Sequence, residues 1–211
     1  MKETILFISP HTDDSELGAG GALIKFLNEG KKVYVAAFCS AKESLKQYDK
    51  PENLLSLEFY AGMNFLGLPK DHCFLFDFPL RDFSKCRQII LDRLIELKNT
   101  IKPDLVIIPS KNDIHQDHSV VHIESIRAFK DTSIWCYELP WNQMKFEGTC
   151  YIKLDNEIVN KKIKLLGHYK SQIEINRPYF QEEFIRSLAR IRGCQSFTDY
   201  AEAFEIIREY A

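Results

Sequence analysis

Residues 5–21 decide the fold of this chain, and they read I-L-F-I-S-P-H-T-D-D-S-E-L-G-A-G-G. The apolar run at residues 5–8 predicts a short buried strand, and a helical pattern begins after the polar residues 11–16. A strand, a polar turn and a helix in this order are typical of an α/β unit, in which ligands bind at the carboxyl end of the strand. We therefore expect residues 11–16, here called the first motif, to carry chemistry.

Outward from this stretch, apolar runs alternate with helical patterns. This alternation over the first half of the chain predicts parallel β-α-β units and thus an α/β fold. Residues 40–50 predict an exposed loop, and the tail at residues 201–210 fits neither a helix nor a strand. The expected strands are residues 32–39, 73–78, 105–108, 133–139 and 149–154, and the expected helices are one ending at Gly30 and those at residues 51–65, 84–100, 116–130, 155–174 and 179–193.

The composition is that of an ordinary globular protein, with 45% hydrophobic and 27% charged residues among 211. This length predicts a single domain, residues 1–211. A net charge of -2 without a long Lys/Arg cluster argues against a nucleic-acid partner or an anionic membrane surface. No apolar run approaches the ~20 residues of a membrane span, and the chain enters its first strand without a signal-like segment, so we expect neither a span nor a cleavable signal.

The six cysteines are scattered without a C-x-x-C pair, and four of them lie inside apolar runs. This pattern favours buried free thiols over a disulfide framework or a cysteine metal site. Free thiols are typical of a reducing compartment, so we expect a cytoplasmic protein.

A second motif, residues 109–118, follows the expected strand at residues 105–108 and reads P-S-K-N-D-I-H-Q-D-H. The two motifs occupy equivalent places on two strands, so they should lie at one edge of one sheet. Each motif alone also has a purely structural explanation. Asp13 and Glu16 fit a capping box, and two polar histidines fit a surface loop in which they bond to the backbone.

Together the two motifs predict an open metal site. Two histidines and a carboxylate from two loops are the ligand set of a catalytic zinc, whose remaining position holds water or substrate. A closed structural site commonly includes cysteine, and none lies near either motif. A metal ion would also supply a hydroxide nucleophile at neutral pH. Bulk water has a pKa of ~15.7 and is hardly ionised at pH 7, whereas water bound to zinc has a pKa of ~7. We do not expect His72, His122 or His168 to bind a metal.

The glycines of residues 18–21 fit the dinucleotide pattern G-x-G-x-x-G poorly, because they lie inside the helical pattern. We expect them to let the first helix pack close to the sheet. Trp135, Tyr137 and Trp141 fit either a sugar subsite or packing positions, and we favour packing because aromatic residues on strands are usually packed.

The motifs resemble those of a known family. P-H-T-D-D-S-E-L-G-A-G-G is similar to the (A/P)-H-P-D-D-x-x-x-G-x-G-G motif of the PIG-L/LmbE zinc-dependent N-deacetylases, and H-Q-D-H is similar to their H-x-D-H motif. Weaker likenesses follow in the family's order, namely E-F-Y-A-G-M-N-F-L-G at residues 58–67, K-S-Q at 170–172 and Y-A-E-A-F at 200–204.

The resemblance implies a Rossmann-like α/β fold, a three-layer sandwich with a mostly parallel sheet. It also implies hydrolysis of the N-acetyl group of an amino sugar, in a small glycoside or a glycan precursor. The same ligands would also suit another divalent metal such as Fe²⁺ in place of zinc. Carried over motif by motif, the resemblance implies that His11, Asp14 and His118 bind one zinc ion. It implies that Asp13 is the general base and that His115 stabilises the oxyanion. Asp117 would orient one of the histidines.

Two departures from the family pattern bear on the substrate more than on the reaction. Thr12 replaces the usual Pro, and Leu55 stands where the family usually has Arg, with Arg81 as an alternative contact for a hydroxyl or phosphate group. Two other functions fit the same residues: another metal-dependent amidase or esterase, and a zinc- or sugar-binding module without catalysis. The base and the oxyanion histidine favour an enzyme. The sugar, its aglycone and the formation of a homo-oligomer stay open.

Overall fold

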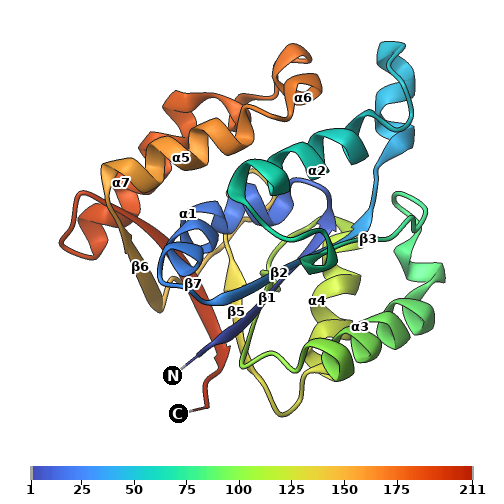
Figure 1. Cartoon of the computed structure of the whole chain (residues 1–211), viewed down its shortest axis with the longest axis horizontal. Coiled ribbons are helices and arrows are strands. Elements are labelled where there is room, and N and C mark those ends of the chain that lie inside the picture. The colour runs from blue at the N-terminus through green and yellow to red at the C-terminus, as the bar shows by residue number, and fades with distance from the viewer. Residues whose placement is uncertain (1, 211) are drawn as a thin grey trace.

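Residues 2–210, which the computed structural model describes, form a sheet of seven strands with helices on both faces (Figure 1). The strands are β1 (Thr4–His11), β2 (Lys32–Cys39), β3 (Cys73–Leu75), β4 (Leu105–Pro109), β5 (Ser133–Tyr137), β6 (Cys150–Leu154) and β7 (Tyr200–Arg208). Their order in the sheet is β3-β2-β1-β4-β5-β7-β6. β1 to β5 run parallel, and β7 runs antiparallel to both of its neighbours. The expected α/β fold with a mostly parallel sheet is therefore confirmed.

Two layers of helices complete the sandwich. The helices are α1 (Asp14–Asn28), α2 (Leu54–Leu66), α3 (Arg87–Ile101), α4 (Gln116–Ala128), α5 (Asn156–Leu166), α6 (Lys170–Glu174) and α7 (Glu182–Gln195). Figure 1 shows α1, α2, α5 and α7 on one side of the sheet and α3 and α4 on the other. Because β1 is covered on both faces, its residues 5–8 are fully buried, which explains their continuous apolar run.

The order of the sheet reverses at β1, since β2 and β3 follow on one side of it and β4 and β5 on the other. The carboxyl ends of β1 and β4 therefore flank the topological switch point, where open α/β sheets bind ligands. β1 ends at His11, inside the first motif, and β4 ends at Pro109, the first residue of the second motif. The expectation that both motifs lie at one edge of one sheet is confirmed.

The glycines of α1 allow it to lie close to the sheet, as expected. A Cβ atom on Gly18 would lie 2.9 Å from Cγ of Tyr137, and one on Gly21 would lie 2.5 Å from Cδ1 of Leu154. Side chains do not pack at such distances. The helix is kinked between these glycines, and the carboxylate of Glu202 on β7 accepts hydrogen bonds from two backbone amides just after the kink.

Some expected elements are wrong, and tertiary contacts explain them. The helix expected at residues 155–174 is broken into α5 and α6, because Tyr169 turns inward and its hydroxyl donates to the carbonyl of Thr12 at 2.6 Å. α7 continues past Gly193, where we expected it to end. The backbone of Asp199 lies so close to Gly193 that no side chain fits at this position. Residues 42–48 of the expected loop form a short 3-10 helix. The undecided tail forms β7, whose partners lie far away in the sequence.

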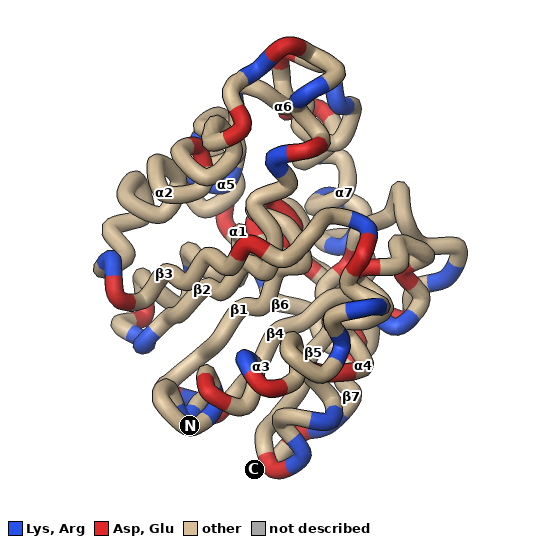
Figure 2. Tube along the Cα trace, turned by 90° about the vertical axis from the view of Figure 1, so that its right-hand side faces the viewer, with Lys and Arg blue, Asp and Glu red and all other residues tan. Residues whose placement is uncertain are grey.

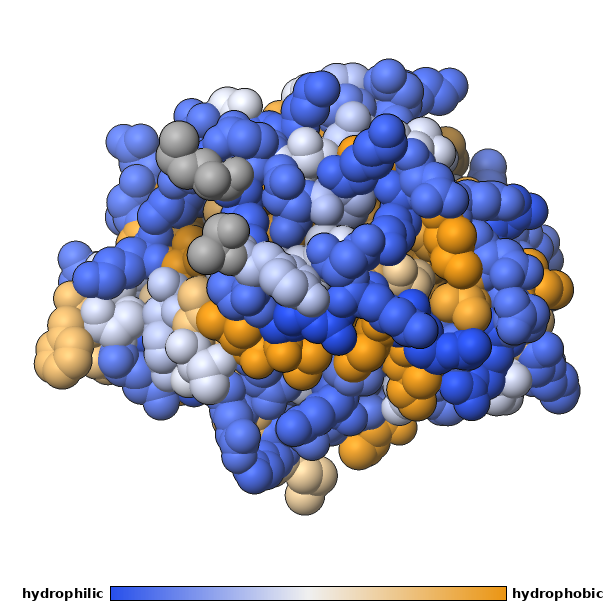
Figure 3. Space-filling view, turned by 90° about the horizontal axis from the view of Figure 1, so that it is seen from below, coloured by the Kyte–Doolittle hydropathy of each residue, from blue (hydrophilic) through white to orange (hydrophobic). Residues whose placement is uncertain are grey.

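Acidic and basic residues are interspersed over the molecule (Figure 2). The face seen in Figure 3 is mostly hydrophilic with small groups of apolar residues, as is usual for a folded protein. Within residues 2–210, no helix is long and apolar enough to cross a membrane. The six cysteines are free, as expected, and three of them are buried.

Candidate metal centre

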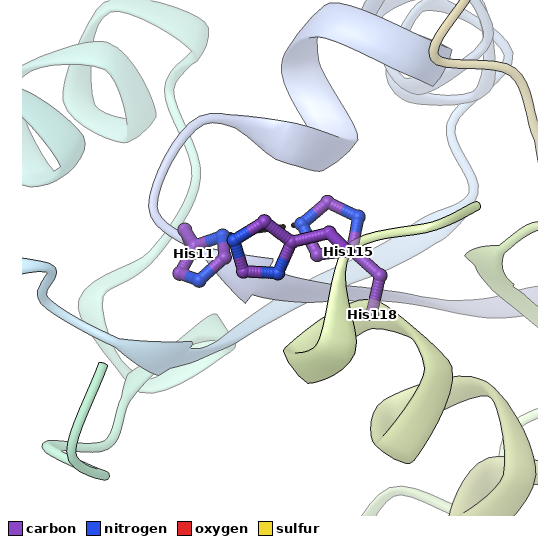
Figure 4. Close-up of side chains that lie close together, drawn as sticks. All are labelled: His11, His115 and His118. Atoms are coloured by element: carbon purple, nitrogen blue, oxygen red, sulfur yellow. Dashed lines mark hydrogen bonds between the residues drawn. The ribbon is translucent and has the colours of Figure 1, made fainter. Parts of the chain in front are cut away.

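The two motifs meet at the switch point of the sheet. His11 is the last residue of β1, Asp14 is the first residue of α1, and His118 lies in the first turn of α4. All three side chains are buried, so a surface loop does not account for His118. Figure 4 shows the rings of His11 and His118 beside that of His115, which precedes α4.

Three ligand-type atoms form a nearly equilateral triangle. Nδ1 of His11 lies 3.1 Å from Oδ2 of Asp14 and 3.2 Å from Nε2 of His118, and this Nε2 lies 3.3 Å from the same Asp14 oxygen. Ligands at ~2.0–2.1 Å from a tetrahedral zinc ion are roughly 3.3–3.4 Å apart. Two imidazole nitrogens and a carboxylate oxygen at this spacing therefore fit a divalent metal with an open fourth position. We call these residues the ligand triangle.

A carboxylate contacts each histidine of the ligand triangle from its far side. Nε2 of His11 lies 3.1 Å from Oδ2 of Asp117, and Nδ1 of His118 lies 2.6 Å from Oδ2 of Asp113. Such carboxylates fix the tautomer and the orientation of metal-binding histidines. Asp113 is absent from the residues that we singled out in the sequence. The only local sign of this role is that Asp113 is an acidic residue within the second motif. An acidic residue just before a helix is equally common in a turn, so the sequence does not distinguish the two roles.

Opposite charges hold the ligand triangle together. Burial acts to lower the pKa of His118, but the carboxylates of Asp14 and Asp113 raise it to about 10. Burial also acts to lower the pKa of His11, and Asp14 and Asp117 outweigh it, so this pKa is raised. Burial would raise the pKa of Asp14, but the two histidines hold it well below its ordinary value. The site therefore favours a cation between these side chains, either a proton or a metal ion.

Asp13 lies at the start of α1 but does not cap it, because its side chain makes no capping hydrogen bond. Glu16 is bonded instead to the hydroxyls of Ser15 and Tyr169. The capping-box explanation of the first motif is therefore wrong. Burial and the adjacent charge of Asp14 raise the pKa of Asp13 to about 7. A carboxylate with this pKa can accept and release a proton near neutral pH.

His115 lies beside the ligand triangle as a neutral ring. Burial and the positive charges of His118 and His11 lower its pKa to about 4. Its Nδ1 accepts a hydrogen bond from the amide of Asp117 at 3.2 Å, so the ring proton is on Nε2. His115 also forms a potential ligand group with His11 and His118, in which the ligand atoms lie within 4.8 Å of one another. The three atoms of the ligand triangle, with Asp14 in place of His115, lie closer together, at 3.1–3.3 Å from one another.

A cavity of about 330 Å³ opens over these residues, a size that suits a small molecule. Trp141 lines it and stacks on Tyr179, with ring centroids 4.1 Å apart and an angle of 10° between the planes. Leu55 and Arg81 line the same cavity. Of the other two aromatic candidates, Tyr137 is fully buried and Trp135 packs on a neighbouring ring, as expected.

The three weaker histidine candidates lie outside the ligand triangle. Nδ1 of His72 and Nδ1 of His122 lie 2.8 and 2.9 Å from backbone carbonyl oxygens. His168 packs against the ring of Phe65.

Solved structures of similar fold cover nearly the whole chain. N,N'-diacetylchitobiose deacetylase from Pyrococcus horikoshii matches with a TM-score of 0.80 and 18% identity, over 98% of this chain and 84% of that chain. The 4-carboxy-2-hydroxymuconate hydratase GalB from Pseudomonas putida matches with a TM-score of 0.82 and 19% identity, over 100% and 98%. A conserved protein from Thermus thermophilus matches with a TM-score of 0.80 and 21% identity, over 100% and 97%. At these identities the likeness shows the fold alone.

The sequence also matches a family model. Residues 6–129 match the PIG-L family, which is described as GlcNAc-PI de-N-acetylase. This segment runs from β1 through α4, so it contains both motifs and more than half of the 211 residues. The chain therefore belongs to the PIG-L family.

Proposed function

We propose that this protein is a metal-dependent hydrolase that removes the N-acetyl group from an amino sugar, in an N-acetylglucosamine-type glycoside or glycan precursor. The observation that carries the proposal is the ligand triangle in the wall of a cavity, next to Asp13, whose side chain is not used to cap α1. The description of the family and the name of the Pyrococcus horikoshii neighbour, which is a deacetylase of an acetylated sugar, support this substrate class.

We assign His11, Asp14 and His118 as the ligands of one zinc ion, and the same three ligands also suit Fe²⁺. When bound there, the metal supplies a Lewis acid that polarises the acyl carbonyl and increases the acidity of water at neutral pH. Asp117 and Asp113 orient the two histidines.

Asp13 is the general base in this proposal. As water adds to the amide carbon, the carboxylate of Asp13 takes one of its protons. It then gives the proton to the nitrogen of the leaving amine as the C–N bond breaks, and acetate and the free amino sugar are the products. A pKa of about 7 suits both transfers. His115 donates from Nε2–H to the carbonyl oxygen as negative charge develops on it.

The sugar would lie along the wall of the cavity. Stacked aromatic rings offer a flat apolar surface to the C–H face of a pyranose, and Trp141 on Tyr179 supplies one beside the ligand triangle. Asn142 and Gln172 also line the cavity and offer amides to sugar hydroxyls. We further propose that residues 1–211 act as a single cytoplasmic domain on a small molecule, without a nucleic-acid or membrane partner.

Two other functions compete with this one. A different metal-dependent amidase or esterase would use the same residues on another acyl group. A binding module without turnover would retain the ligand triangle but has no use for a base such as Asp13. The hydratase among the neighbours shows that the fold is compatible with other chemistry, so the reaction has to be measured.

The test combines metal content with acetate release. We expect about one zinc or iron per chain by elemental analysis of the purified protein, and its loss in His118→Ala. We also expect acetate and free amine from N-acetylated glucosamine glycosides, and not from the matching O-acetyl esters. Metal without turnover on any acyl substrate would favour the binding module, and faster release of another acyl group would favour the rival hydrolase.

A further inference from the structure

A buried ion pair outside the cavity is bonded to the backbone of α1 at its kink. Lys162 of α5 and Glu202 of β7 are 7% and 6% exposed, and Nζ of Lys162 lies 2.7 Å from Oε1 of Glu202. Neither is among the described residues that line the cavity. Lysine and glutamate are rarely buried unless they are paired and hydrogen-bonded, so the other bonds of this pair indicate its role.

The ion pair contacts both partners of one helical hydrogen bond. In an unbroken α-helix the amide of Gly21 would donate to the carbonyl of Leu17, four residues earlier. In α1 this amide donates to Oε1 of Glu202 at 2.8 Å, and the carbonyl of Leu17 accepts from Nζ of Lys162 at 2.7 Å. Ala19, which lies between them, has non-helical angles, with φ at -142° and ψ at 19°. Because helices kink where a side chain inserts into this ladder of bonds, the ion pair accounts for the kink.

The two side chains cap the two halves of α1 separately. The carboxylate of Glu202 accepts from the amides of Gly21 and Ala22, as a capping side chain does at the start of a helix. The ammonium group of Lys162 bonds to a carbonyl near the end of the first half, where a cation is favourable. A Cβ atom on Gly21 would lie 2.9 Å from Oε1 of Glu202, so this glycine leaves room for the carboxylate. The Y-A-E-A-F stretch at residues 200–204 and a glycine of α1 thus share one physical role.

The first half of α1 carries the acidic residues of the site. Asp14 is its first residue, Asp13 precedes it, and the amide of Leu17 donates to the carbonyl of Asp13 at 2.9 Å. Only a short segment of helix, residues 14–18, therefore separates the ligand triangle from the kink. A change in the angle of the kink would move Oδ2 of Asp14 relative to the two histidines of the triangle. A misplacement of about 1 Å in an active site can cost about 10²-fold in rate.

We infer that Lys162 and Glu202 are positioning residues for the proposed reaction. By fixing the kink in α1, they place Asp14 among the metal ligands and Asp13 beside them. The inference rests on the proposed function for its effect on turnover, whereas its effect on metal binding can be measured without a substrate.

The test measures metal affinity, kcat and KM in Lys162→Met and Glu202→Gln. Each variant removes the charge of one member of the pair, and Glu202→Gln also retains the shape of the side chain. We expect the metal affinity, from a competitive chelator titration, and kcat each to fall about tenfold or more. KM should change less than kcat, because Trp141 and Tyr179, the proposed wall for the sugar, lie outside α1.

Arg192→Met is the matched control. Arg192 of α7 is the cation of another ion pair on the same side of the sheet, and its guanidinium bonds to the buried Glu138 and to Gln195 (Figure 1). Like Lys162→Met, this variant leaves a buried carboxylate without its cation, so both should be less stable than the parent in urea unfolding. Arg192→Met should nevertheless retain the metal affinity and the kcat of the parent.

A double variant, Lys162→Met with Glu202→Gln, separates positioning from the burial of charge. It leaves no uncompensated charge, so it should be more stable than Lys162→Met. Since it also lacks the ion pair across the kink, its metal affinity and kcat should stay low. The pair would only stabilise the fold, and the inference would be overturned, by any of three results: recovery of both values in the double variant, an equal loss in Arg192→Met, or parental values in both single variants.

If the parent releases no acetate, the proposed function fails, and the metal affinities alone test the pair. If the parent binds no metal either, crystal structures of the parent and of Glu202→Gln decide. A displaced Asp14 in the variant would support the inference, and an Asp14 in the parental position would overturn it.

Discussion

Oδ2 of Asp113 lies 2.6 Å from Nδ1 of His118, and both side chains are buried. When the His118 ring is neutral, Nδ1–H donates to this carboxylate, so the lone pair is on Nε2, the atom that faces His11 and Asp14. The other oxygen of Asp113 accepts from the amide of His115 at 2.9 Å. One carboxylate thus prepares a metal ligand and holds the start of α4.

We predict that Asp113→Asn weakens metal binding by ~10–100-fold. The amide oxygen can still accept from His115, but the amide NH₂ would face Nδ1 of His118 and favour the tautomer with the proton on Nε2. The ring would then present N–H to the metal. A competitive chelator titration measures the affinity. Asp71→Asn, an exposed site, is the control, and an unchanged affinity in Asp113→Asn would remove the orienting role of this residue.

Asp13→Asn should separate catalysis from metal binding. Because Asp13 contributes no atom to the ligand triangle, the variant is expected to retain its metal while kcat falls ~10²-fold or more. His118→Ala should lose the metal itself. Elemental analysis and acetate release on the same preparations measure both effects. Full activity in Asp13→Asn would show that another group takes the proton.

The stability of the metal-free protein should decrease as pH rises. The pKa of His118 is raised to about 10 from an ordinary value near 6.5, so its contribution is complete below pH ~6.5 and is lost as pH rises through about 10. The raised pKa of His11 acts in the same direction. Urea unfolding of chelator-treated protein between pH 6.5 and 9.5 measures the decrease. It should be smaller in His118→Gln, and a flat profile in the parent would contradict the charge pairing of the ligand triangle.

Much of the fold could be predicted because its signals are local. The run at residues 5–8 and the helical pattern after it identify β1 and α1, and the alternation that follows identifies the parallel sheet. The break between α5 and α6 could not be predicted, because it depends on Tyr169 reaching Thr12. β7 escaped assignment since its partners, β5 and β6, lie elsewhere in the chain.

The site was predictable to the same extent. Each motif follows a strand end at the switch point, so the meeting of the two motifs was predictable, whereas the choice of His11, Asp14 and His118 among their polar residues came from the resemblance to the family. Arg177, which also lines the cavity, carries no such signal. It lies just after α6, a helix that Glu58 of α2 holds through Ser171, and only the tertiary structure brings these elements to the cavity.

The last prediction concerns two glycines of α1 that differ in their neighbours. A Cβ on Gly18 would lie 2.9 Å from Cγ of the Tyr137 ring and 3.0 Å from the backbone oxygen of Glu138, and neither can move easily. A Cβ on Gly20 would lie 3.3 Å from Cγ of Lys162, so this side chain has to shift by only a few tenths of an ångström. Alanine otherwise stabilises a helix interior by roughly 0.5–1 kcal/mol relative to glycine.

Gly18→Ala should therefore lower the free energy of unfolding by about 1–3 kcal/mol through overpacking, whereas Gly20→Ala should stay within about 1 kcal/mol of the parent. Urea titrations of both variants make the comparison. Gly18→Ala should also reduce turnover, because relief of the overlap moves the first half of α1, which carries Asp14. Equal stabilities for the two variants would mean that the helix can shift away from the sheet at no cost, and the close approach would then not explain the glycines of α1.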